Sequence, residues 1–410
     1  MQNLKQYSMA DADTARCPFA YYAAMRSEQP VHQDPGTGVW WITRHEDILK
    51  AAMDTKALSS QSDLITRNSF KPKAQALWDA AGMRALKTLV TSDPPEHDEY
   101  RNVGLQLFPQ KTVEQITPQI QSLVDELIAA LAGRGEIEFI RDFAARLPGT
   151  VVCDEFGLPR EDQPRFKTWT DAVIGLLDPS ISEEREVELV QHQIEMFRYL
   201  DKHLQRAAVE MPGRVIHTLA TMNKRDGTPF SNLERGWMLL TTFVGGNETT
   251  MNMLAMGMRR LATDAALQSE LRAHPEKVAA FVEEMLRLEG SVQALLRVAT
   301  RDIEIGGQVI PKGANVALCS GSANRDEKQW PDGDAFRLDR KNGNRHLTFG
   351  YGRHSCIGMH LARRELTIAF TSLLKAFGKI ALTVPAEQIV QVPLPFHRAI
   401  AALPVKVSAA

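Results

Sequence analysis

The residues around Cys356 form a glycine-rich loop that runs directly into a helical pattern. Glycine stands at Gly350, Gly352 and Gly358, where it permits positive φ and lets the backbone approach a bulky partner. Apolar residues recur at helical spacing over residues 359–373, so we expect a helix to begin about at the cysteine. Its first N–H groups and the positive end of its dipole favour a thiolate, the form of cysteine that binds metals. The stretch therefore predicts a metal-binding thiolate beside a large, flat group.

Composition limits the class of protein. The 410 residues are 44% hydrophobic and 24% charged, as in globular proteins, and proline and glycine are not clustered into a linker. A formal net charge of −2 without a basic run gives no reason to expect nucleic acid or a membrane surface as partner. The N-terminal residues form no apolar stretch, and the four cysteines are too widely spaced for a zinc site or a disulfide framework. We expect a cytoplasmic protein.

Hydrophobic periodicity predicts a mainly α chain with a minor β region. Helical spacing covers the central part of the chain, over residues 112–133, 161–177, 183–209 and 214–222. Strands are expected at residues 39–43 and 315–319, and a hairpin at residues 303–310 around a two-glycine turn.

One long apolar run, residues 237–258, predicts a helix that crosses the core, and Ser231 with Glu234 has the spacing of a capping box before it. Inside the run lies Gly-Gly-Asn-Glu-Thr-Thr, where glycines and threonines weaken a helix that the flanks favour. Such local conflict is typical of functional sites. A simple contact between helices does not explain a carboxylate, Glu248, in an apolar segment.

The string Phe-Gly-x-Gly-x-His-x-Cys-x-Gly, from Phe349 to Gly358, resembles the cytochrome P-450 superfamily, the heme-thiolate monooxygenases. The resemblance implies the cytochrome P-450 fold in one large domain, residues 1–410, with an N-terminal extension at 1–20 and a core at 21–407. It implies heme b (iron protoporphyrin IX) as cofactor, with Cys356 as the axial iron ligand. His354 would reach a heme propionate, and Phe349 would pack beside the sulfur.

Further cofactor contacts follow from the same resemblance. His97 and Arg101, four residues apart after Asp-Pro-Pro, match the family's propionate-binding helix, and Arg297 matches its third cation. Positive charge at these positions would neutralise the two carboxylates of a buried heme. Gly245 would lie against the cofactor.

Two other motifs carry expected roles. Glu248 and Thr249 resemble the acid and alcohol at the family's oxygen-binding kink, where they organise water for proton delivery. Glu284 and Arg287 resemble the Glu-x-x-Arg element, which Arg340 would complete in a structural role.

For the substrate, the resemblance points to pocket residues that are mostly apolar: Val244, Val292, Gln293, Leu295 and Phe396. We expect a small or medium hydrophobic molecule with a polar handle near Gln293. Residues 59–90 would form a lid, with Arg67, Lys71 and Lys73 as candidate contacts to a substrate carboxylate.

Electrons must come from another protein, because the chain has no dinucleotide Gly-x-Gly-x-x-Gly and no cysteine cluster. A ferredoxin and its reductase are implied, with NAD(P)H as the remote donor and O2 as co-substrate. The ferredoxin would dock near Cys356, on Arg353, His360, Arg363 and Arg364. The chain itself is expected to be a monomer.

Two alternatives stay open beside monooxygenation. A heme-thiolate enzyme that uses peroxide or isomerises its substrate would have less use for Glu248 and Thr249 as proton donors. A heme sensor would need an output domain, for which the chain leaves no length. A phosphate cradle at the glycine loop would need a lysine and a threonine after it, and the loop lacks them.

Overall fold

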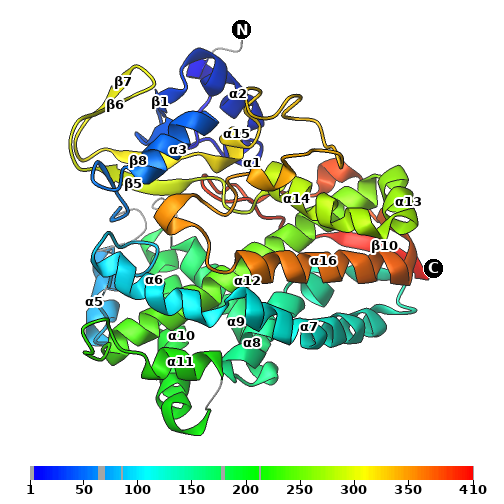
Figure 1. Cartoon of the computed structure of the whole chain (residues 1–410), viewed down its shortest axis with the longest axis horizontal. Helices are drawn as coiled ribbons and strands as arrows, with labels where there is room; N and C mark the ends of the chain where they lie inside the picture. The colour runs from blue at the N-terminus through cyan, green and yellow to red at the C-terminus, as the bar shows by residue number, and fades with distance from the viewer. Residues whose placement is uncertain (1–3, 63–69, 85, 177–180, 212–213, 410) are drawn as a thin grey trace. The chain divides into compact units, whose positions relative to one another are not determined.

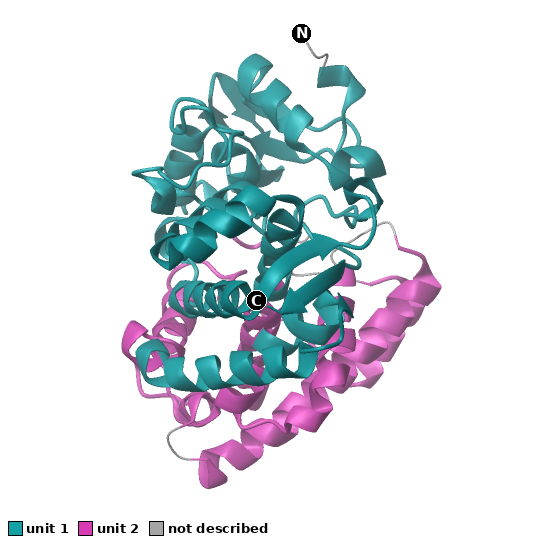
Figure 2. Ribbon diagram, turned by 90° about the vertical axis from the view of Figure 1, so that its right-hand side faces the viewer, with its two compact units in different colours: residues 1–59, 113–147, 249–410 teal, residues 60–112, 148–248 magenta. Residues whose placement is uncertain are grey.

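The computed structural model describes residues 4–62, 70–84, 86–176, 181–211 and 214–409. The chain divides into two compact units (Figure 2). Unit 1 comprises residues 1–59, 113–147 and 249–410, and unit 2 comprises residues 60–112 and 148–248. Helix α12 (Asn232–Thr263) passes from one unit to the other. The predicted single domain stays a prediction.

Unit 1 contains a five-stranded sheet in the order β1-β2-β8-β5-β3 (Figure 1). Its strands are β1 (Val31–Gln33), β2 (Trp40–Ile42), β3 (Leu58–Ser59), β5 (Leu295–Ala299) and β8 (Asn315–Leu318). Strand β2 runs parallel to β8, and the other pairs are antiparallel. Apolar residues such as Val31, Ile42 and Val316 are fully buried in a core that also includes Ile48 of α3 (His45–Met53).

Two smaller sheets also lie in unit 1. A three-stranded sheet has the order β4-β10-β9, formed by β4 (Glu136–Glu138), β9 (Phe377–Leu382) and β10 (Pro404–Ala409). The hairpin of β6 (Ile303–Ile305) and β7 (Gln308–Ile310) turns at Gly306 and Gly307 with φ of 58° and 76°. Two successive positive φ values suit the right-handed strand twist, which is why glycine occupies this turn.

The helices of unit 1 include the one that follows the cysteine loop. They are α1 (Ala12–Arg16), α2 (Phe19–Glu28), α3, most of α7 (Gln110–Leu131), α13 (Ala265–Ala273), α14 (Val278–Glu289), α15 (Ser320–Ala323) and α16 (Met359–Ala376). A Cβ at Gly257 of α12 would lie 2.2 Å from the ring of Phe370 on α16. Glycine at this position therefore lets the two helices pack closely.

Unit 2 is helical. Its elements are α5 (Pro72–Ala80), α6 (Glu96–Leu107), most of α8 (Arg146–Phe156), α9 (Gln163–Gly175), α10 (Glu183–Glu210) and α11 (Val215–Thr221). Aromatic rings fill its core: Phe166 of α9 has its ring centroid 5.6 Å from that of Trp169 and 4.9 Å from that of Phe243 on α12. Such edge and tilted contacts stabilise beyond the apolar area that they bury.

Short helical turns join these elements. They are the 3-10 helices η1 (Leu4–Gln6), η3 (Arg160–Asp162), η4 (Pro275–Lys277), η5 (Gly343–Arg345), η6 (Gly352–His354) and η7 (Ala386–Gln388), and the π-helix η2 (Ile140–Ala144).

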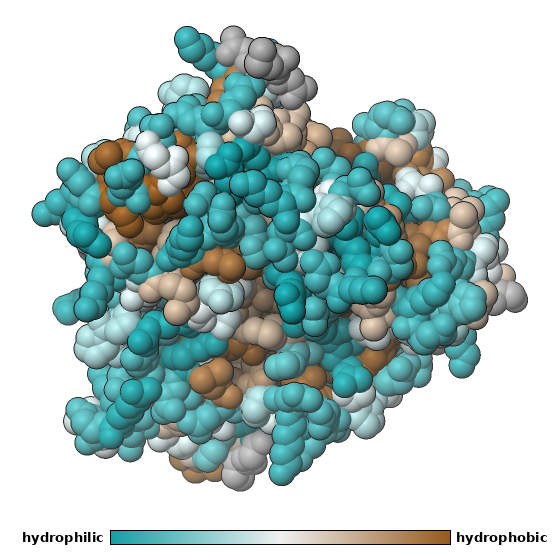
Figure 3. All heavy atoms as spheres, turned by 45° about the horizontal axis from the view of Figure 1, so that its top comes forward, coloured by the Kyte–Doolittle hydropathy of each residue, from teal (hydrophilic) through white to brown (hydrophobic). Residues whose placement is uncertain are grey.

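The mainly α fold with a minor β region confirms the prediction. Periodicity located the central helices to within two residues at each end. The capping box is also present, because Glu234 accepts the Ser231 N–H at 2.7 Å and donates its own N–H to Ser231 Oγ at 3.2 Å. Among the described residues no helix is long and apolar enough to cross a membrane. On the face in Figure 3, hydrophobic residues lie in separate patches among hydrophilic ones.

Candidate functional site

The loop before α16 exposes the thiol of Cys356. The Cys356 N–H donates to Phe349 O at 2.7 Å, which closes the loop on itself, and the Ser355 N–H donates to Gly352 O at 3.2 Å. Gly350 and Gly352 have φ of 70° and 67°, a conformation that disfavours any residue with a Cβ. The prediction of positive φ is confirmed at these two glycines.

Gly358 differs from that expectation. Its φ is −89°, which any residue can adopt, and it is the N-cap of α16. The helix thus begins at Met359, three residues after the cysteine rather than at it. A Cβ at Gly358 would lie 3.9 Å from Cys356 Sγ, so glycine here leaves the space beside the sulfur open. An exposed thiol next to a residue without a side chain fits a thiolate-bound planar group such as heme.

Hydrogen bonds attach the front of this loop to neighbouring elements of unit 1. The Leu347 N–H donates to Asn324 Oδ1 at 2.7 Å, and Asn324 Nδ2 donates to Thr348 Oγ1 at 2.9 Å. Thr348 Oγ1 in turn donates to Leu286 O on α14 at 2.6 Å. A Cβ at Gly350 would lie 3.1 Å from His354 O and 3.3 Å from Leu295 Cδ1. The front of the loop is therefore fixed to neighbouring elements, and Gly350 has little room for a larger residue.

The four predicted propionate cations belong to different units. In unit 1, Arg297 on β5 is 4% exposed and donates Nη1 to Leu296 O at 2.7 Å, while His354 is half-buried in η6. In unit 2, His97 and Arg101 stand one turn apart on α6, with His97 buried and its Nδ1 3.2 Å from Asp98 Oδ1. A role of these four residues at the cofactor stays a prediction.

Helix α12 runs unbroken through the Gly-Gly-Asn-Glu-Thr-Thr string, so the weak helix formers do not end it. Gly245 is exposed, and a Cβ there would meet nothing within 4 Å, although Val244 before it is buried. Glu248 is 8% exposed and Thr249 is half-buried. The helix thus presents open backbone at Gly245 one turn before the pair predicted to handle protons.

Glu284 lies at the centre of a buried ionic network. Arg287 donates Nη2 to Glu284 Oε1 at 2.7 Å, and Arg340 donates Nε to the same oxygen at 2.9 Å. Arg287 Nη1 also donates to Asn324 O and Gly333 O, at 2.7 and 2.6 Å. These contacts join α14 to the segment that leads to the cysteine loop, which suits the predicted structural role.

Three of the four candidate substrate residues of unit 1, namely Val292, Gln293 and Leu295, lie on one stretch that leads into β5, and the fourth is Phe396. Val292 and Leu295 are half-buried, and Leu295 lies beside Gly350 of the cysteine loop. Gln293 is 2% exposed and donates Nε2 to Gly290 O at 2.6 Å. The ring of Phe396 stacks on Trp41, with centroids 5.5 Å apart. The apolar members suit a hydrophobic ligand, whereas the Gln293 amide lies against the backbone.

Among the predicted lid cations, Arg67 lies outside the described residues. Lys71 Nζ donates to Ile181 O, and Lys73 Nζ lies 3.4 Å from Glu183 Oε2 at the start of α10. Both lysines therefore have partners within unit 2.

On the predicted docking face, Arg353, His360 and Arg364 are exposed. Arg363 differs, because both its Nε and its Nη2 donate to Glu283 on α14.

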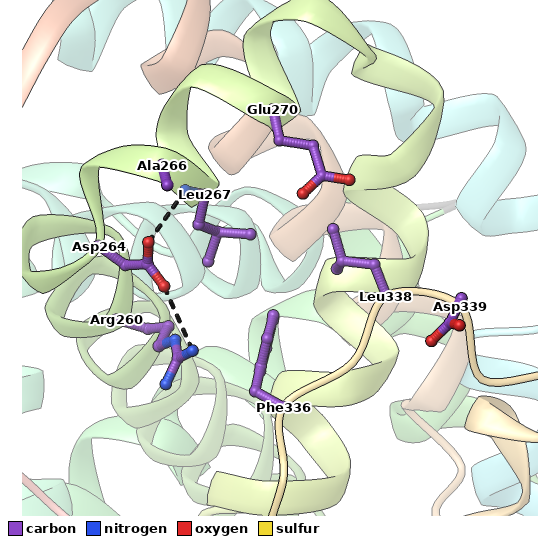
Figure 4. Close-up of a pocket in the computed structure, with 8 residues that line it drawn as sticks. All are labelled: Arg260, Asp264, Ala266, Leu267, Glu270, Phe336, Leu338 and Asp339. Atoms are coloured by element: carbon purple, nitrogen blue, oxygen red, sulfur yellow. Dashed lines mark hydrogen bonds and ion pairs between the residues drawn. The ribbon is translucent and has the colours of Figure 1, made fainter.

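A surface pocket of about 400 Å³ lies in unit 1 away from these residues, lined by Arg260, Asp264, Ala266, Leu267, Glu270, Phe336, Leu338 and Asp339 (Figure 4). Its charged groups are already paired: Asp264 with Arg260 at 3.3 Å, Glu270 with Lys277 at 2.6 Å, and Asp339 with Arg337 at 3.1 Å. The pocket contains none of the predicted site residues.

Sequence reasoning missed three residues that support the cysteine loop: Glu283, Asn324 and His346. Asn324 lies 23 residues before its partner Leu347 in the chain. Glu283 adjoins Glu284, but the sequence alone gives no sign that the two carboxylates face different partners.

A family model and several known proteins match this chain. The family model "Cytochrome P450" matches residues 50–391. Cytochrome P450 109 of Bacillus spizizenii is 30% identical over 95% of this chain and 92% of its own length. The cytochrome P450 monooxygenase PikC of Streptomyces venezuelae is 32% identical over 96% of this chain and 92% of its own.

Solved structures are similar as well. Cytochrome P450 CREJ in complex with (4-ethylphenyl) dihydrogen phosphate has a TM-score of 0.90 at 25% identity, over 96% of this chain and 98% of its own. The chain belongs to the cytochrome P450 family of heme monooxygenases.

Proposed function

We propose that this chain inserts one oxygen atom from O2 into a small or medium hydrophobic organic molecule, by hydroxylation or O-dealkylation. The observation that carries the proposal is the exposed Cys356 thiol, beside which Gly358 leaves room for a flat cofactor. Cys356 would hold the iron of heme b. A thiolate-bound heme supplies the electron density that favours O–O cleavage.

The chain's own residues have distinct parts in this proposal. His97, Arg101, Arg297 and His354 would bind the heme carboxylates. Glu248 and Thr249 would hold and pass protons, because Val244 and the glycines beside them carry none. Val292 and Leu295 would position an apolar substrate and exclude water; both are half-buried, and Leu295 lies beside Gly350 of the cysteine loop.

A separate ferredoxin and its reductase would supply electrons from NAD(P)H. The exposed basic residues Arg353, His360 and Arg364 near Cys356 suit an acidic partner. Since Arg363 is bonded to Glu283, we leave it out of this docking face.

The substrate itself is proposed only as a class. The neighbour CREJ is described with (4-ethylphenyl) dihydrogen phosphate, an aromatic molecule with one polar end. An aromatic substrate with a polar handle fits the apolar character of the predicted pocket residues. A ligand screen that includes 4-ethylphenyl phosphate and 4-ethylphenol, read by the shift of the heme Soret band, would test this class.

The function itself is tested by spectroscopy of the purified protein. The ferrous carbon-monoxide complex should show the red-shifted Soret band of thiolate ligation, and Cys356→His should lose that band. Cys153→Ser serves as the control, because this cysteine is buried and should not affect the band. Retention of the band in Cys356→His would remove Cys356 as the ligand.

A further inference from the structure

Glu283 of α14 is bonded by two residues that also contact Phe349 of the cysteine loop. Arg363 of α16 donates Nε to Oε1 at 2.6 Å and Nη2 to Oε2 at 2.9 Å, a two-point contact that fixes the plane of the guanidinium. His346 Nε2 lies 3.2 Å from Oε2. All four residues belong to unit 1.

The orientation of His346 is defined by its second nitrogen. The Thr348 N–H donates to His346 Nδ1 at 3.3 Å, so Nδ1 carries no proton. A neutral ring must then carry its proton on Nε2, which donates to Glu283. Burial lowers the pKa of His346, in agreement with a neutral ring. His346 is therefore a donor to Glu283, and Arg363 is the positive partner of that carboxylate.

The carboxylate stays ionised in this setting. Burial alone would raise the pKa of Glu283, but the hydrogen bonds from His346 and Arg363 outweigh it and bring the pKa to about 2. The three side chains are largely shielded, with exposed fractions of 19% for Glu283, 28% for Arg363 and 0% for His346. A partly buried, two-point ion pair of this kind is stronger than one on an open surface.

Both partners of Glu283 lie against the same ring. The Arg363 guanidinium carbon is 4.6 Å from the centroid of Phe349, within the range of a cation–π contact. The His346 ring lies 5.7 Å from Phe349, tilted by 43°. Phe349 O, in turn, accepts the Cys356 N–H at 2.7 Å. A continuous set of contacts thus runs from α14 through Arg363 and Phe349 to the backbone of Cys356.

We propose that Arg363, held by Glu283, is a positioning residue that fixes Phe349 and thereby the loop that presents the Cys356 sulfur. Its charge would serve this contact rather than the docking of an electron donor. The inference rests on the proposed thiolate ligation and goes beyond it, because it assigns a role to residues outside the Phe-Gly-x-Gly-x-His-x-Cys-x-Gly string.

With heme bound, the exposed thiol of Cys356 would be covered, and Phe349, which is expected to pack beside the sulfur, would help to exclude water. A loose Phe349 would then let water reach the sulfur. Hydrogen bonds from solvent to a ligating thiolate weaken its electron donation and change the reduction potential of the metal. Loss of Arg363 should therefore shift the heme reduction potential to more positive values. It should also speed the conversion of the red-shifted carbon-monoxide band to the shorter-wavelength band of a cofactor that has lost its thiolate.

The experiment uses the holoprotein and three variants: Arg363→Lys, Phe349→Leu and the double variant. Lysine keeps the charge but loses the two-point contact and the planar stack, and leucine keeps an apolar side chain without a ring. Each single variant should convert the band about 2- to 5-fold faster, the range expected for a cation–π contact. The double variant should be no faster than the more severe single one, because both changes remove the same contact.

Lys375→Gln is the matched control, since Lys375 is an exposed basic residue of the same helix and lies outside the proposed docking face. It removes a positive charge from α16 and should leave the band and its conversion rate at the wild-type values. If Arg363→Lys behaves like Lys375→Gln, or if the two single effects simply add, the inference is wrong. If the wild-type protein shows no red-shifted band at all, the proposed thiolate function fails instead, so the two failures are distinguishable.

Discussion

Arg287 holds both carboxylate oxygens of Glu284, with Nε 2.8 Å from Oε2 and Nη2 2.7 Å from Oε1. The two side chains are 0% and 2% exposed, so neither charge is screened by water. Arg340 Nε and the Arg337 N–H also donate to Glu284 Oε1, each at 2.9 Å. One buried carboxylate thus fixes α14 against residues 337–340, which end nine residues before Phe349 of the cysteine loop.

Glu284→Gln should therefore destabilise the protein strongly. It leaves the buried Arg287 guanidinium without its counter-charge, and loss of one partner of a buried ion pair costs about 3–5 kcal/mol of unfolding free energy. Urea unfolding followed by circular dichroism measures this cost. Glu270→Gln is the control, because its pair with Lys277 is 43% and 40% exposed and should cost about 0–1 kcal/mol. Equal losses of unfolding free energy in the two variants would contradict the prediction that burial makes the ion pairs of Glu284 strong.

Local signals predicted much of this fold. Helix bounds follow from apolar spacing, and the turn of the β6–β7 hairpin follows from two glycines, because both depend on residues close in the chain. Positive φ at Gly350 and Gly352 follows for the same reason. The start of α16 was placed too early, since apolar spacing does not show that Gly358 caps the helix.

The sequence does not predict the contacts between residues that are far apart in the chain. His346 and Arg363 meet Glu283 across 63 and 80 residues of chain, and no local pattern encodes such a meeting. The same holds for the β4-β10-β9 sheet, whose strands pair Glu136–Glu138 with the C-terminal β10. The sequence suggested a docking face from the basic residues of α16. Only the fold shows that one of them, Arg363, is bonded to Glu283 within the protein.

Gly350→Ala should weaken heme binding more than an ordinary glycine substitution does. Alanine at φ of 70° is strained by about 1–2 kcal/mol, and its Cβ would also lie 3.1 Å from His354 O. Gly313→Ala is the matched control, with φ of 81° but no atom within 4 Å of the added Cβ. Heme transfer to an apo acceptor measures the difference. A similar transfer rate in both variants would contradict this prediction. It would show that the contact of the added Cβ with His354 O does not weaken heme binding.

Glu365 on α16 should make stability fall as pH rises. Burial raises the pKa of this carboxyl from 4.5 to about 8, and in the described part of the chain its Oε2 has no hydrogen-bond partner. Between these two values the unfolded chain has lost the proton that the folded chain keeps. Unfolding then releases a proton, so the free energy of unfolding decreases from about pH 4.5 to about pH 8 and levels off above.

Glu365→Gln should remove this dependence, because the amide does not titrate and matches the protonated acid in shape. Urea unfolding at intervals from pH 5 to 9 tests it as the difference between wild type and variant, in which the contributions of the histidines cancel. The variant should gain stability relative to wild type as pH rises. Glu387→Gln, an exposed site, serves as the control and should show no such gain. A constant difference between wild type and Glu365→Gln across this range would contradict a buried, neutral Glu365.

Proton delivery gives the last prediction, which concerns Glu248 and Thr249 of α12. In the proposed function, splitting O2 would take two protons, which Val244 and Gly245 cannot supply, so the neighbouring acid and alcohol would be the donors. Thr249→Ala should leave heme content and substrate binding nearly intact while NADH is spent on hydrogen peroxide instead of product.

Glu248→Gln should instead slow O2 consumption itself, because it removes the acid that resupplies the protons, and general acid–base groups contribute typically about 10²–10⁴-fold. Thr263→Ala, in the exposed last turn of the same helix, is the control for loss of a threonine hydroxyl. NADH consumed, peroxide formed and product formed are measured together for each variant. Full coupling of NADH to product in Thr249→Ala would exclude Thr249 from the relay, and an unchanged rate in Glu248→Gln would exclude Glu248. Because the two variants are expected to change different quantities, one coupling and the other rate, a single set of measurements separates the role of the alcohol from that of the acid.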